Sequence, residues 1–471
     1  MKKLFLLKTV FAVLCAGLIF TGCSSKENSY DVAVIGSGGA GLSAAISAQK
    51  AGASVIVLEK MAFAGGNTNY ATGGLNASET SVQKNKGIAD SNEQFFEDTM
   101  KGGKQKNNPD LVKILTSKSG ETVDWLISLG MDLSDVGKLA GATNHRAHRP
   151  SGGAAIGSHF TGVMVKAAEK AGITIRYNAK VTGIINKNGK VAGVSFISEG
   201  KQIDIKAKSV IIATGGFGSN PEIIVSYKPS LKGFGTTNHP GATGDAFEWI
   251  KPFNAALKDM EEIQTHPTVV PKKNIMITEA VRGNGAIMIN RESKRFEQEM
   301  ATRDAMSEAI LNQAGSTAFL FFDQGVRESL KAIESYHKKG LLSEGETIAE
   351  LAEHLNIPIA ELEATVKRYN EFVENKKDED FGRADMPRKL EKPPFYAVEV
   401  GPAVHHTMGG IVINEKAEVL DTKGNVIPGL FAAGEVTGGV HGANRLGGNA
   451  MADIAVFGKI AGESAAAFVK K

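Results

Sequence analysis

Short apolar runs alternate with helical patterns in the first half of the chain. Residues 31–35 and 54–59 are mostly hydrophobic, as strands buried on both faces are. Between them, residues 40–51 have the pattern of a packed helix. A third apolar run, 209–213, ends at a Thr-Gly-Gly sequence. This order predicts a β-α-β unit, and with it an α/β fold.

The segments between these runs are more polar. Residues 84–130 show helical periodicity, and 158–171 predicts another helix. Three alternating segments follow, near 173–186, 191–197 and 202–206, with turn residues between them. Such a series predicts a small antiparallel meander.

The character of the chain changes at about residue 261. Glycine becomes rare after Gly285, and charged helical patterns dominate through residue 376. The clearest spans 358–375, with Pro358 in its first turn, where a missing N–H costs nothing. These patterns predict an inserted capping unit rich in helices.

The earlier character returns after a group of prolines at 387–394. Glycine is frequent again from residue 401. An apolar run at 430–433 predicts a strand, and 448–470 predicts a final helix.

The N-terminus has the pattern of a signal peptide. Lys2, Lys3 and Lys8 flank an uncharged and mostly apolar run of 14 residues, 9–22, shorter than the ~20 residues that a spanning helix needs. Removing this leader takes the formal net charge from +3 to 0, so we expect no nucleic-acid partner.

The leader ends at Cys23. Small residues before this cysteine and polar residues after it resemble the lipobox of bacterial lipoproteins, although Phe20 stands where an aliphatic residue is usual. We expect a signal peptide at 1–22, a tether at 23–29 and lipidation of Cys23. This implies export and a lipid anchor on a membrane outside the cytoplasm. An uncleaved N-terminal anchor is the alternative.

The 54 glycines fall in clusters, which favours backbone packed close to a ligand. The run Gly36-Ser37-Gly38-Gly39-Ala40-Gly41 matches G-x-G-x-x-G between a predicted strand and a predicted helix. Glu59 ends the next strand, where an acid can accept hydrogen bonds from ribose hydroxyls. Together these features predict a Rossmann-like dinucleotide-binding domain.

Further glycine clusters favour FAD over NAD. Residues 65–68 and 71–77 lie where the chain would reach the isoalloxazine ring, and 429–435 forms a strand followed by glycine and an acid. The expected cofactor-binding residues are Gly36, Gly38, Gly39, Ala40, Gly41, Glu59, Lys60, Gly66, Asn67, Thr68, Gly73, Gly74, Val181, Ala213, Thr214, Gly215, Gly216, Gly434, Glu435, Gly447, Asn449 and Ala450.

With these residues, the sequence resembles the flavoprotein subunits of the fumarate reductase/succinate dehydrogenase family, and most closely the soluble flavocytochrome c fumarate reductases. The resemblance runs from about Tyr30 to the C-terminus. Its further motifs are Thr278-Glu279-Ala280-Val281-Arg282-Gly283, Thr302-Arg303-Asp304, His405-His406-Thr407-Met408-Gly409-Gly410 and the run from Gly438 to Asn449.

The resemblance implies a domain plan. An FAD-binding domain in two segments, 30–260 and 401–471, is expected to hold an α+β capping domain inserted at 261–400. The composition shifts near 261 and 400 agree with this plan.

Two departures from the family change the expected chemistry. Members of membrane complexes carry a histidine bonded to FAD in an Arg-Ser-His-Thr run, whereas residues 66–70 here are Gly-Asn-Thr-Asn-Tyr, so we expect noncovalent FAD. The chain also has no C-x-x-C-H haem motif. Electrons are therefore expected from a separate donor: a flavoprotein, free flavin or a cytochrome.

Reducing the C=C bond of a carboxylate needs a hydride, a proton and cations that bind the carboxylates. Arginine suits the last task because its fork donates two hydrogen bonds and stays charged. The resemblance implies that Arg303 is the proton donor and that Glu279 and Arg282 relay its proton. It implies that His266, Thr278, His405 and Arg445 bind carboxylate. The spacing to Arg445 favours His405 over His406, for which we expect a structural role through its backbone.

We therefore expect an extracytoplasmic, FAD-dependent fumarate reductase that gives succinate and supports anaerobic respiration. One alternative is a reductase of another unsaturated acid, such as urocanate, acrylate, methacrylate or cinnamate. Others are an enzyme like L-aspartate oxidase and an electron-carrying lipoprotein. No residue spacing suggests a metal site.

Overall fold

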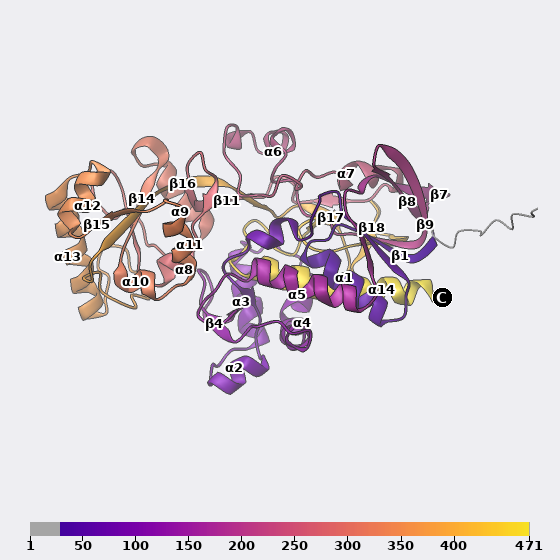
Figure 1. The fold of residues 1–471 in the computed structure, drawn as a ribbon, viewed down its shortest axis with the longest axis horizontal. Helices are drawn as coiled ribbons and strands as arrows, with labels where there is room; N and C mark the ends of the chain where they lie inside the picture. Colours follow the sequence, from indigo (N-terminus) through magenta and orange to yellow (C-terminus); the bar gives the residue numbers. More distant parts are fainter. Residues whose placement is uncertain (1–28, 471) are drawn as a thin grey trace, which may run out of the picture.

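The computed structural model describes residues 29–470 (Figure 1). The predicted signal peptide, Cys23 and the tether up to residue 28 lie outside the described residues. None of the helices in 29–470 combines the length and the apolar character needed to cross a bilayer.

The larger part of the molecule is built on an eight-stranded sheet. Its main path runs β18-β19-β9-β1-β2-β6, and β1, β2, β6, β9 and β19 pair in parallel. These strands are β1 (Ser29–Ile35), β2 (Val55–Leu58), β6 (Thr174–Arg176), β9 (Lys201–Ile212), β18 (Glu418–Leu420) and β19 (Val426–Ala432). The last two follow the cap in sequence, so the sheet is made by two segments of the chain.

Helices cover this sheet. Helix α1 (Gly39–Lys50) lies against α14 (Asn449–Val469), and α5 (Gly157–Lys170) packs beside α1 (Figure 1). The α1–α14 contact is close because small residues line it: a Cβ at Gly462 would lie 2.2 Å from the Ala44 carbonyl oxygen. The N-terminus of α1 is thereby fixed at the carboxyl end of β1.

The meander differs from the expectation in two ways. Residues 174–176 form β6, which pairs in parallel with β2, so only β7 (Lys180–Lys187), β8 (Lys190–Ser198) and β9 make the meander. The predicted strands at 202–206 and 209–213 are one 12-residue strand, β9. Its first half pairs with β8 and is partly exposed, whereas its second half pairs with β1 and is buried, which gives one strand two sequence patterns.

Polar helices and two small sheets complete this part. The predicted helical region 84–130 contains α2 (Ser81–Lys86), α3 (Asn92–Gly102) and α4 (Pro109–Ser128). Short helices α6 (Pro221–Tyr227) and α7 (Ala246–Trp249) follow β9. One small sheet has β3 (Leu75–Asn76), β5 (Ala147–Arg149) and β4 (Asp135–Gly137); the other has β10 (Leu257–Lys258), β17 (Gly410–Val412) and β20 (Thr437–Gly438).

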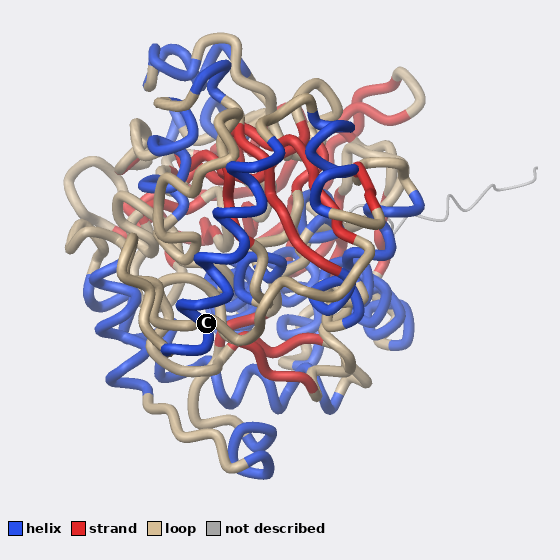
Figure 2. The backbone as a smooth tube through the Cα atoms, turned by 90° about the vertical axis from the view of Figure 1, so that its left-hand side faces the viewer, coloured by secondary structure: helices blue, strands red, loops and turns tan. Residues whose placement is uncertain are grey.

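The cap has its own sheet and its own hydrophobic core. The sheet order is β12-β11-β16-β14-β13, with β15 on β16. Its strands are β11 (Ile263–Val270), β12 (Ile275–Met276), β13 (Ile287–Ile289), β14 (Ala318–Asp323), β15 (Ser343–Gly345) and β16 (Phe395–Thr407). Its helices are α8 (Ala280–Gly283), α9 (Arg303–Leu311), α10 (Gln324–Glu328), α11 (Ala332–Lys338), α12 (Ile348–Leu355) and α13 (Ile359–Asn375). In Figure 2 this end faces the viewer, with helices outside the strands.

Two paired strands connect the cap to the larger part. Strands β11 and β16 are antiparallel, and β16 contributes Phe395 and Val400 to the cap core but Val404 to the core around the large sheet. The strand pair therefore carries side chains from one core to the other. The mixed α/β architecture with an inserted α+β unit confirms the predicted fold class.

Candidate active site

A glycine-lined cavity lies at the carboxyl ends of β1 and β2. The chain turns sharply after β1 because Gly36 has φ +102°, and a Cβ there would lie 2.3 Å from the Ala213 carbonyl oxygen. Gly38, the N-cap of α1, brings no side-chain cap, and the Gly39 N–H at the start of the helix donates to Thr68 Oγ1 at 2.9 Å beside the cavity. Such an N-terminus favours a phosphate.

The residues around this glycine-lined cavity fit FAD. Gly38, Gly66 and Gly215 all line it, and a Cβ on any of them would meet no protein atom closer than 3.7 Å. Side chains at these three positions would therefore project into the space that the cofactor needs. The site combines open glycines, a helix N-terminus and the acid Glu59, which is the donor and acceptor set that a dinucleotide requires.

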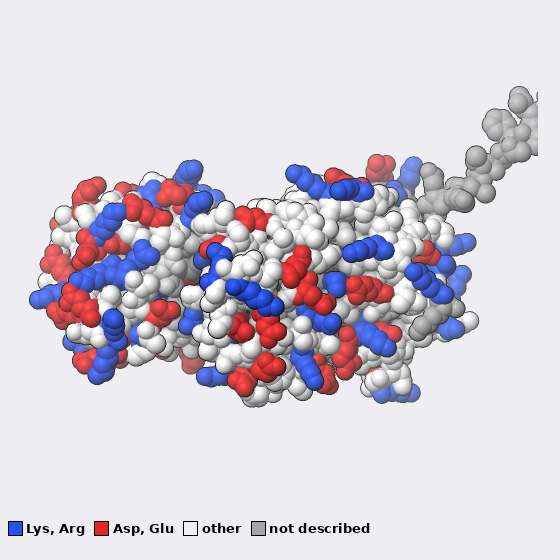
Figure 3. Space-filling view, turned by 90° about the horizontal axis from the view of Figure 1, so that it is seen from below, with Lys and Arg blue, Asp and Glu red and all other residues white. Residues whose placement is uncertain are grey.

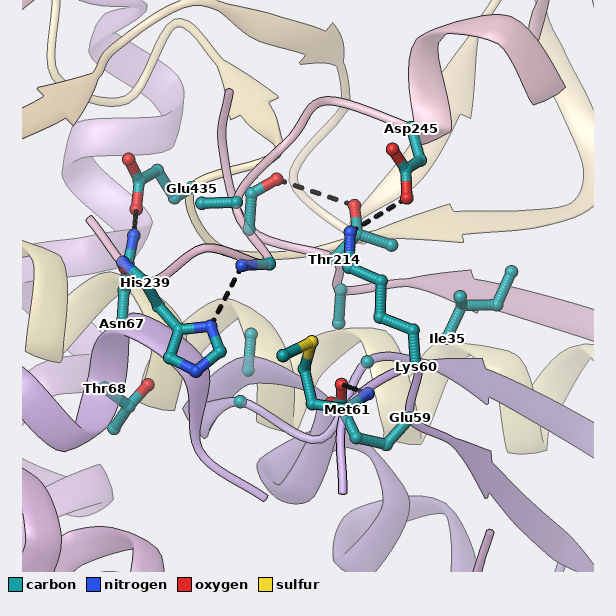
Figure 4. A pocket seen from close by; sticks show the side chains of 18 of the residues that line it. Ile35, Glu59, Lys60, Met61, Asn67, Thr68, Thr214, His239, Asp245 and Glu435 are labelled. Atoms are coloured by element: carbon teal, nitrogen blue, oxygen red, sulfur yellow. Dashed lines mark hydrogen bonds and ion pairs between the residues drawn. The ribbon is translucent and has the colours of Figure 1, made fainter. Parts of the chain in front are cut away.

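Polar side chains surround the same cavity (Figure 4). The Glu59 carboxylate accepts hydrogen bonds from Ser37 N, Ser37 Oγ and Met61 N at 2.7–2.9 Å, which fixes its orientation. Lys60 Nζ donates to Thr243 and Asp245 at 2.7 and 2.8 Å. The segment holding these partners, residues 239–249, was not predicted; its two glycines, Gly241 and Gly244, with Thr243 and Asp245 beside them, were the signal available.

A second cavity, of about 1060 Å³, adjoins the first and lies between the large sheet and the cap. Asn67, Thr68 and Glu435 line both cavities. We call the second one the arginine cavity, because Arg303 and Arg445 line it together with His266, Thr278, Glu279 and His405. The structure thus brings together all the predicted substrate and relay residues except Arg282, which lies behind the wall.

Most predicted cofactor residues line one of the two cavities: Gly36, Gly38, Gly39, Ala40, Glu59, Lys60, Gly66, Asn67, Thr68, Gly73, Gly74, Val181, Ala213, Thr214, Gly215, Glu435 and Ala450. Gly41, Gly216, Gly434, Gly447 and Asn449 do not line either one. These five shape the wall instead; a Cβ at Gly41, for example, would lie 1.9 Å from the Gly36 carbonyl oxygen.

Arg303, Glu279 and Arg282 form a buried chain of charges. Arg303 Nε donates to Glu279 Oε2 at 3.0 Å, and Arg282 Nη2 lies 3.8 Å from the same oxygen. The Ala140 N–H donates to Glu279 Oε1 at 2.7 Å. Burial alone would raise the pKa of Glu279, but the two arginines lower it below its usual range. The carboxylate therefore stays charged between two guanidinium groups.

Gln264, which sequence reasoning missed, joins the two arginines of the cavity. Its Oε1 accepts from Arg303 Nη1 at 3.3 Å and from Arg445 Nη2 at 3.1 Å. Its amide group donates to the Asn444 side chain and to the Arg445 carbonyl oxygen, which fixes the orientation of the amide. A buried polar residue two positions before His266 on one strand was the signal available. Burial, with Arg303 nearby, lowers the pKa of Arg445 to about 9.

His266 presents an N–H to the arginine cavity. Burial and then Arg303 lower its pKa well below the usual value, so the ring is neutral. The Thr268 N–H points at its Nδ1 from 3.3 Å, and the Thr268 hydroxyl donates instead to the Ile277 carbonyl oxygen. The ring proton therefore sits on Nε2, which has no partner among the described residues.

His405 lies next to His266, with ring centroids 5.0 Å apart. Burial and Arg303 lower its pKa well below the usual value too. Its Nδ1 is 2.7 Å from the Thr237 hydroxyl, a partner that was not predicted. When Thr237 donates to Nδ1, the Nε2–H of His405 is free to donate to an anion.

Thr278 stands at the start of the short helix α8. Its N–H donates to the Tyr336 hydroxyl at 3.0 Å, and its own hydroxyl oxygen accepts from the Ala280 N–H at 3.4 Å. Tyr336, on α11, also lines the arginine cavity. Thr278 is thus held in the wall by two hydrogen bonds, each of which has a backbone N–H as its donor.

The structure gives His406 more than the expected backbone role. Its imidazole lines the arginine cavity, with Nδ1 3.5 Å from Glu435 Oε1 and Nε2 without a partner among the described residues. Burial raises the pKa of Glu435 and lowers that of His406, so both favour their neutral forms. This pair lies where the two cavities meet.

The arrangement can bind a carboxylate dianion and supply a proton beside it. Two guanidinium groups, the Nε2–H of His266 and the neutral ring of His405 face one space. Burial of a dianion requires such partners, because an unpaired charge is costly outside water. The cavity shared with the cofactor places this space next to the flavin-binding residues.

Comparison with known proteins agrees with this site. The family described as "FAD binding domain" matches residues 31–451. "Fumarate reductase (cytochrome)" of Shewanella frigidimarina is 50% identical over 450 residues, which cover 95% of this chain and 79% of that protein.

Two further relatives widen the comparison. "Urocanate reductase" of Eggerthella lenta is 35% identical over 461 residues, covering 93% of this chain and 74% of that protein. The solved structure of the open conformation of a flavocytochrome c3 fumarate reductase has a TM-score of 0.80 and 44% identity, over 94% of this chain and 79% of that one.

Proposed function

The chain belongs to the FAD-binding family that includes the flavocytochrome c fumarate reductases, and we propose that it reduces fumarate to succinate. It is an FAD-dependent oxidoreductase that acts on the CH–CH bond of unsaturated carboxylates. The choice of fumarate rests on one observation: cationic and N–H donor groups from both the cap and the sheet domain surround the arginine cavity. That set suits a carboxylate at each end of a short substrate.

In this proposal the arginine cavity orients the dianion. Arg445 and the Nε2–H groups of His266 and His405 bind carboxylate oxygens. Carboxylate needs donors, so substrate selects the tautomer of His405 in which Thr237 donates to Nδ1. Cations beside one carboxylate stabilise the carbanion character that grows there.

When bound and reduced by the electron donor, FAD would supply a hydride to one alkene carbon. Arg303 gives a guanidinium proton to the other carbon, which completes the C–H bonds of succinate. A guanidinium in water has a pKa above about 12, so this transfer depends on the charge that develops next to it. Arg282 then passes a proton to the Glu279 carboxylate across the 3.8 Å contact, and Glu279 hands it on to the neutral Arg303. A proton from solvent restores the charge of Arg282.

A second candidate is reduction of another unsaturated acid. The urocanate reductase from Eggerthella lenta, at 35% identity, favours this alternative because it shows that substrate varies among similar chains. The sheet-side donors and Arg303 serve either substrate. The set that must distinguish them is His266, Thr278 and Glu279 on the cap side.

Offering a series of acceptors to reduced enzyme tests the substrate. Anaerobically reduced protein is mixed in turn with fumarate, urocanate, acrylate, methacrylate and cinnamate, and flavin absorbance is followed. Rapid reoxidation by fumarate alone is expected. Faster reoxidation by a monocarboxylate would contradict fumarate as the substrate. No reoxidation by any of the five acids would contradict the proposal that the protein is a reductase.

We also propose that the protein works outside the cytoplasm, anchored through lipid on Cys23. The basic start, apolar run and polar tether of residues 1–29 support this. Cells fed an alkyne fatty acid should yield labelled protein in the membrane fraction, and Cys23→Ala should yield unlabelled protein. Equal labelling of the two would contradict lipidation at this residue.

Electrons are proposed to come from a separate donor. The chain spans 79% of the relative called "Fumarate reductase (cytochrome)" and has no haem-attachment sequence of its own. Mixing oxidised protein with a reduced cytochrome, flavodoxin or free flavin tests the candidates by the rate of flavin reduction. A candidate donor is excluded if it reduces the flavin no faster than buffer that contains no reductant.

A further inference from the structure

Helix α11 of the cap places two lysines along the arginine cavity. Lys331 is the N-cap of α11 and Lys339 its C-cap, eight residues and about two turns apart. Ser335 lies midway between them, so the three form one stripe along the helix. All three line the cavity, and all three are exposed to solvent. They therefore lie where the cavity opens.

The opposite side of this opening belongs to the loop 150–155. Ala154 and Ala155 line the cavity there. A Cβ at Gly152 would lie 2.8 Å from Lys331 Nζ, so the ammonium group of Lys331 reaches across to this loop. A substrate entering between cap and loop passes this lysine.

The two lysines have no carboxylate partner within 4.0 Å among residues 29–470. The nearest acid along α11, Glu334, is held by Arg327 Nε at 2.7 Å. His337 of α11 contacts Glu344 at 3.2 Å. The ammonium charges at the opening are thus left for another anion.

Charge along the arginine cavity is unevenly placed. The acidic residues of its lining, Glu279, Glu435 and Asp453, are buried or nearly so, and Glu279 is paired with Arg303. The charged side chains at the exposed end of the lining are the two lysines. Elsewhere, on the face seen in Figure 3, acidic and basic side chains are mixed. The local excess of positive charge faces the entering substrate.

We propose that Lys331 and Lys339 steer dianionic substrate into the arginine cavity and so favour dicarboxylates over monocarboxylates. This rests on the proposed function, which supplies the dianion. The lysines act on approach and do not touch the reacting atoms. Cations at the mouth of a low-dielectric cleft raise the rate of association with anions, and salt weakens the effect.

The size of the effect follows from Coulomb's law. For a dianion at about 10 Å in water, each lysine is expected to raise the association rate about threefold at 0.01 M ionic strength. Losing both should lower kcat/KM about five- to tenfold at that ionic strength and less than about twofold at 0.3 M. A monoanion should lose only about two- to threefold, because its charge is half as large.

The test compares Lys331→Gln/Lys339→Gln with wild type and with Lys338→Gln. Lys338 is an exposed lysine of the same helix that does not line the cavity, so it is a matched control. The second-order rate of reoxidation of reduced enzyme is measured with fumarate and with acrylate from 0.01 to 0.3 M ionic strength. The double variant should lose rate and salt dependence with fumarate, while its kcat and the behaviour of Lys338→Gln stay close to wild type. Equal salt dependence in all three proteins would overturn the proposal.

A binding measurement separates this proposal from the proposed function. Malonate, a dicarboxylate that cannot be reduced, is mixed rapidly with oxidised enzyme, and its association rate is read from flavin absorbance. Steered binding of malonate in wild type, lost in the double variant, supports the role of the lysines even if fumarate is not reduced. Malonate association that is unchanged in the double variant contradicts it even if fumarate is reduced.

Discussion

At the scale of single residues, the site depends on neutral imidazoles. Burial and Arg303 lower the pKa values of His266 and His405, so both rings favour the neutral form. Thr268 fixes the protonated nitrogen of His266, and the Thr237 hydroxyl contacts Nδ1 of His405. In the proposed mechanism, these neutral rings donate to carboxylate without adding to the charge that Arg303 and Arg445 already supply. Thr268 and Thr237 then act by holding the two rings in place as donors.

Replacing Thr237 tests this arrangement. Thr237→Val removes the contact to His405 Nδ1 and leaves its tautomer unselected. Loss of one hydrogen bond of about 1 kcal/mol predicts a KM for fumarate about three- to tenfold higher with kcat little changed. Thr237→Ser keeps the hydroxyl and should behave like wild type. Steady-state kinetics of the three proteins measure this difference. A Thr237→Val variant with an unchanged KM would contradict the role of Thr237 in positioning His405.

The candidate site residues came from the resemblance to a known family. Arg303, Glu279 and Arg445 lie in motifs shared with a known family, and the structure places all three on one cavity. Gln264 and Thr237 lie outside such motifs, and their partners are distant in sequence. Gln264 meets Arg303 from α9 and Arg445 from the loop before α14, and Thr237 reaches His405 beside the isolated bridge between residues 236 and 404. Only the folded chain brings these partners together.

At the scale of elements, local patterns predicted local structure. The β1-α1-β2 unit formed as expected because each apolar run is buried within one sheet. The sequence predicted two strands where the structure has the single strand β9, because the two halves of β9 pair with different neighbours. The cap sheet could not be derived from helical patterns, since β11 and β16 pair across more than a hundred residues.

The turn between β1 and α1 gives a prediction at this scale. Gly41→Ala places a methyl 1.9 Å from the Gly36 carbonyl oxygen, so the helix must move away from the strand. Overpacking of this kind costs about 1–3 kcal/mol, and we expect FAD to bind at least about tenfold more weakly, with a lower melting temperature.

Gly162→Ala is the control for this change. Gly162 lies within α5, and a Cβ there meets nothing within 4 Å. Alanine should leave FAD affinity unchanged and stabilise the helix by up to about 1 kcal/mol. Fluorescence titration with FAD and thermal melting compare the two variants; similar FAD affinity in both would contradict the close-packing explanation.

At the scale of the whole molecule, burying the site affects stability. His266 and His406 are buried and His405 is half-buried, and the pKa values of all three lie well below their usual 6.5. As pH falls below 6.5, the unfolded chain binds protons that the folded protein does not, so folding is destabilised. Glu435 and Asp259, whose pKa values are raised by burial, act in the opposite sense.

We therefore predict that the free energy of unfolding decreases as the pH is lowered from 6.5 to 5.5. Each imidazole contributes up to about 1.4 kcal/mol per pH unit, so the urea midpoint should decrease markedly over this window. His406→Asn, which removes one of the three rings, should show a smaller slope. Urea unfolding at pH 7.5, 6.5 and 5.5, with FAD in constant excess, measures the slopes. A midpoint independent of pH would show that the rings are protonated in the folded protein.

The proposed mechanism depends on delivery of the proton by Arg303 while fumarate is reduced. The most direct measurement mixes anaerobically reduced wild type and Arg303→Ala with fumarate, following flavin absorbance and the succinate formed. We predict one succinate per flavin in wild type, and reoxidation at least about 10³-fold slower in a variant that still binds FAD, with Arg303→Lys intermediate or equally slow. Wild-type rates in the FAD-loaded Arg303→Ala protein, or no succinate from wild type, would contradict the account.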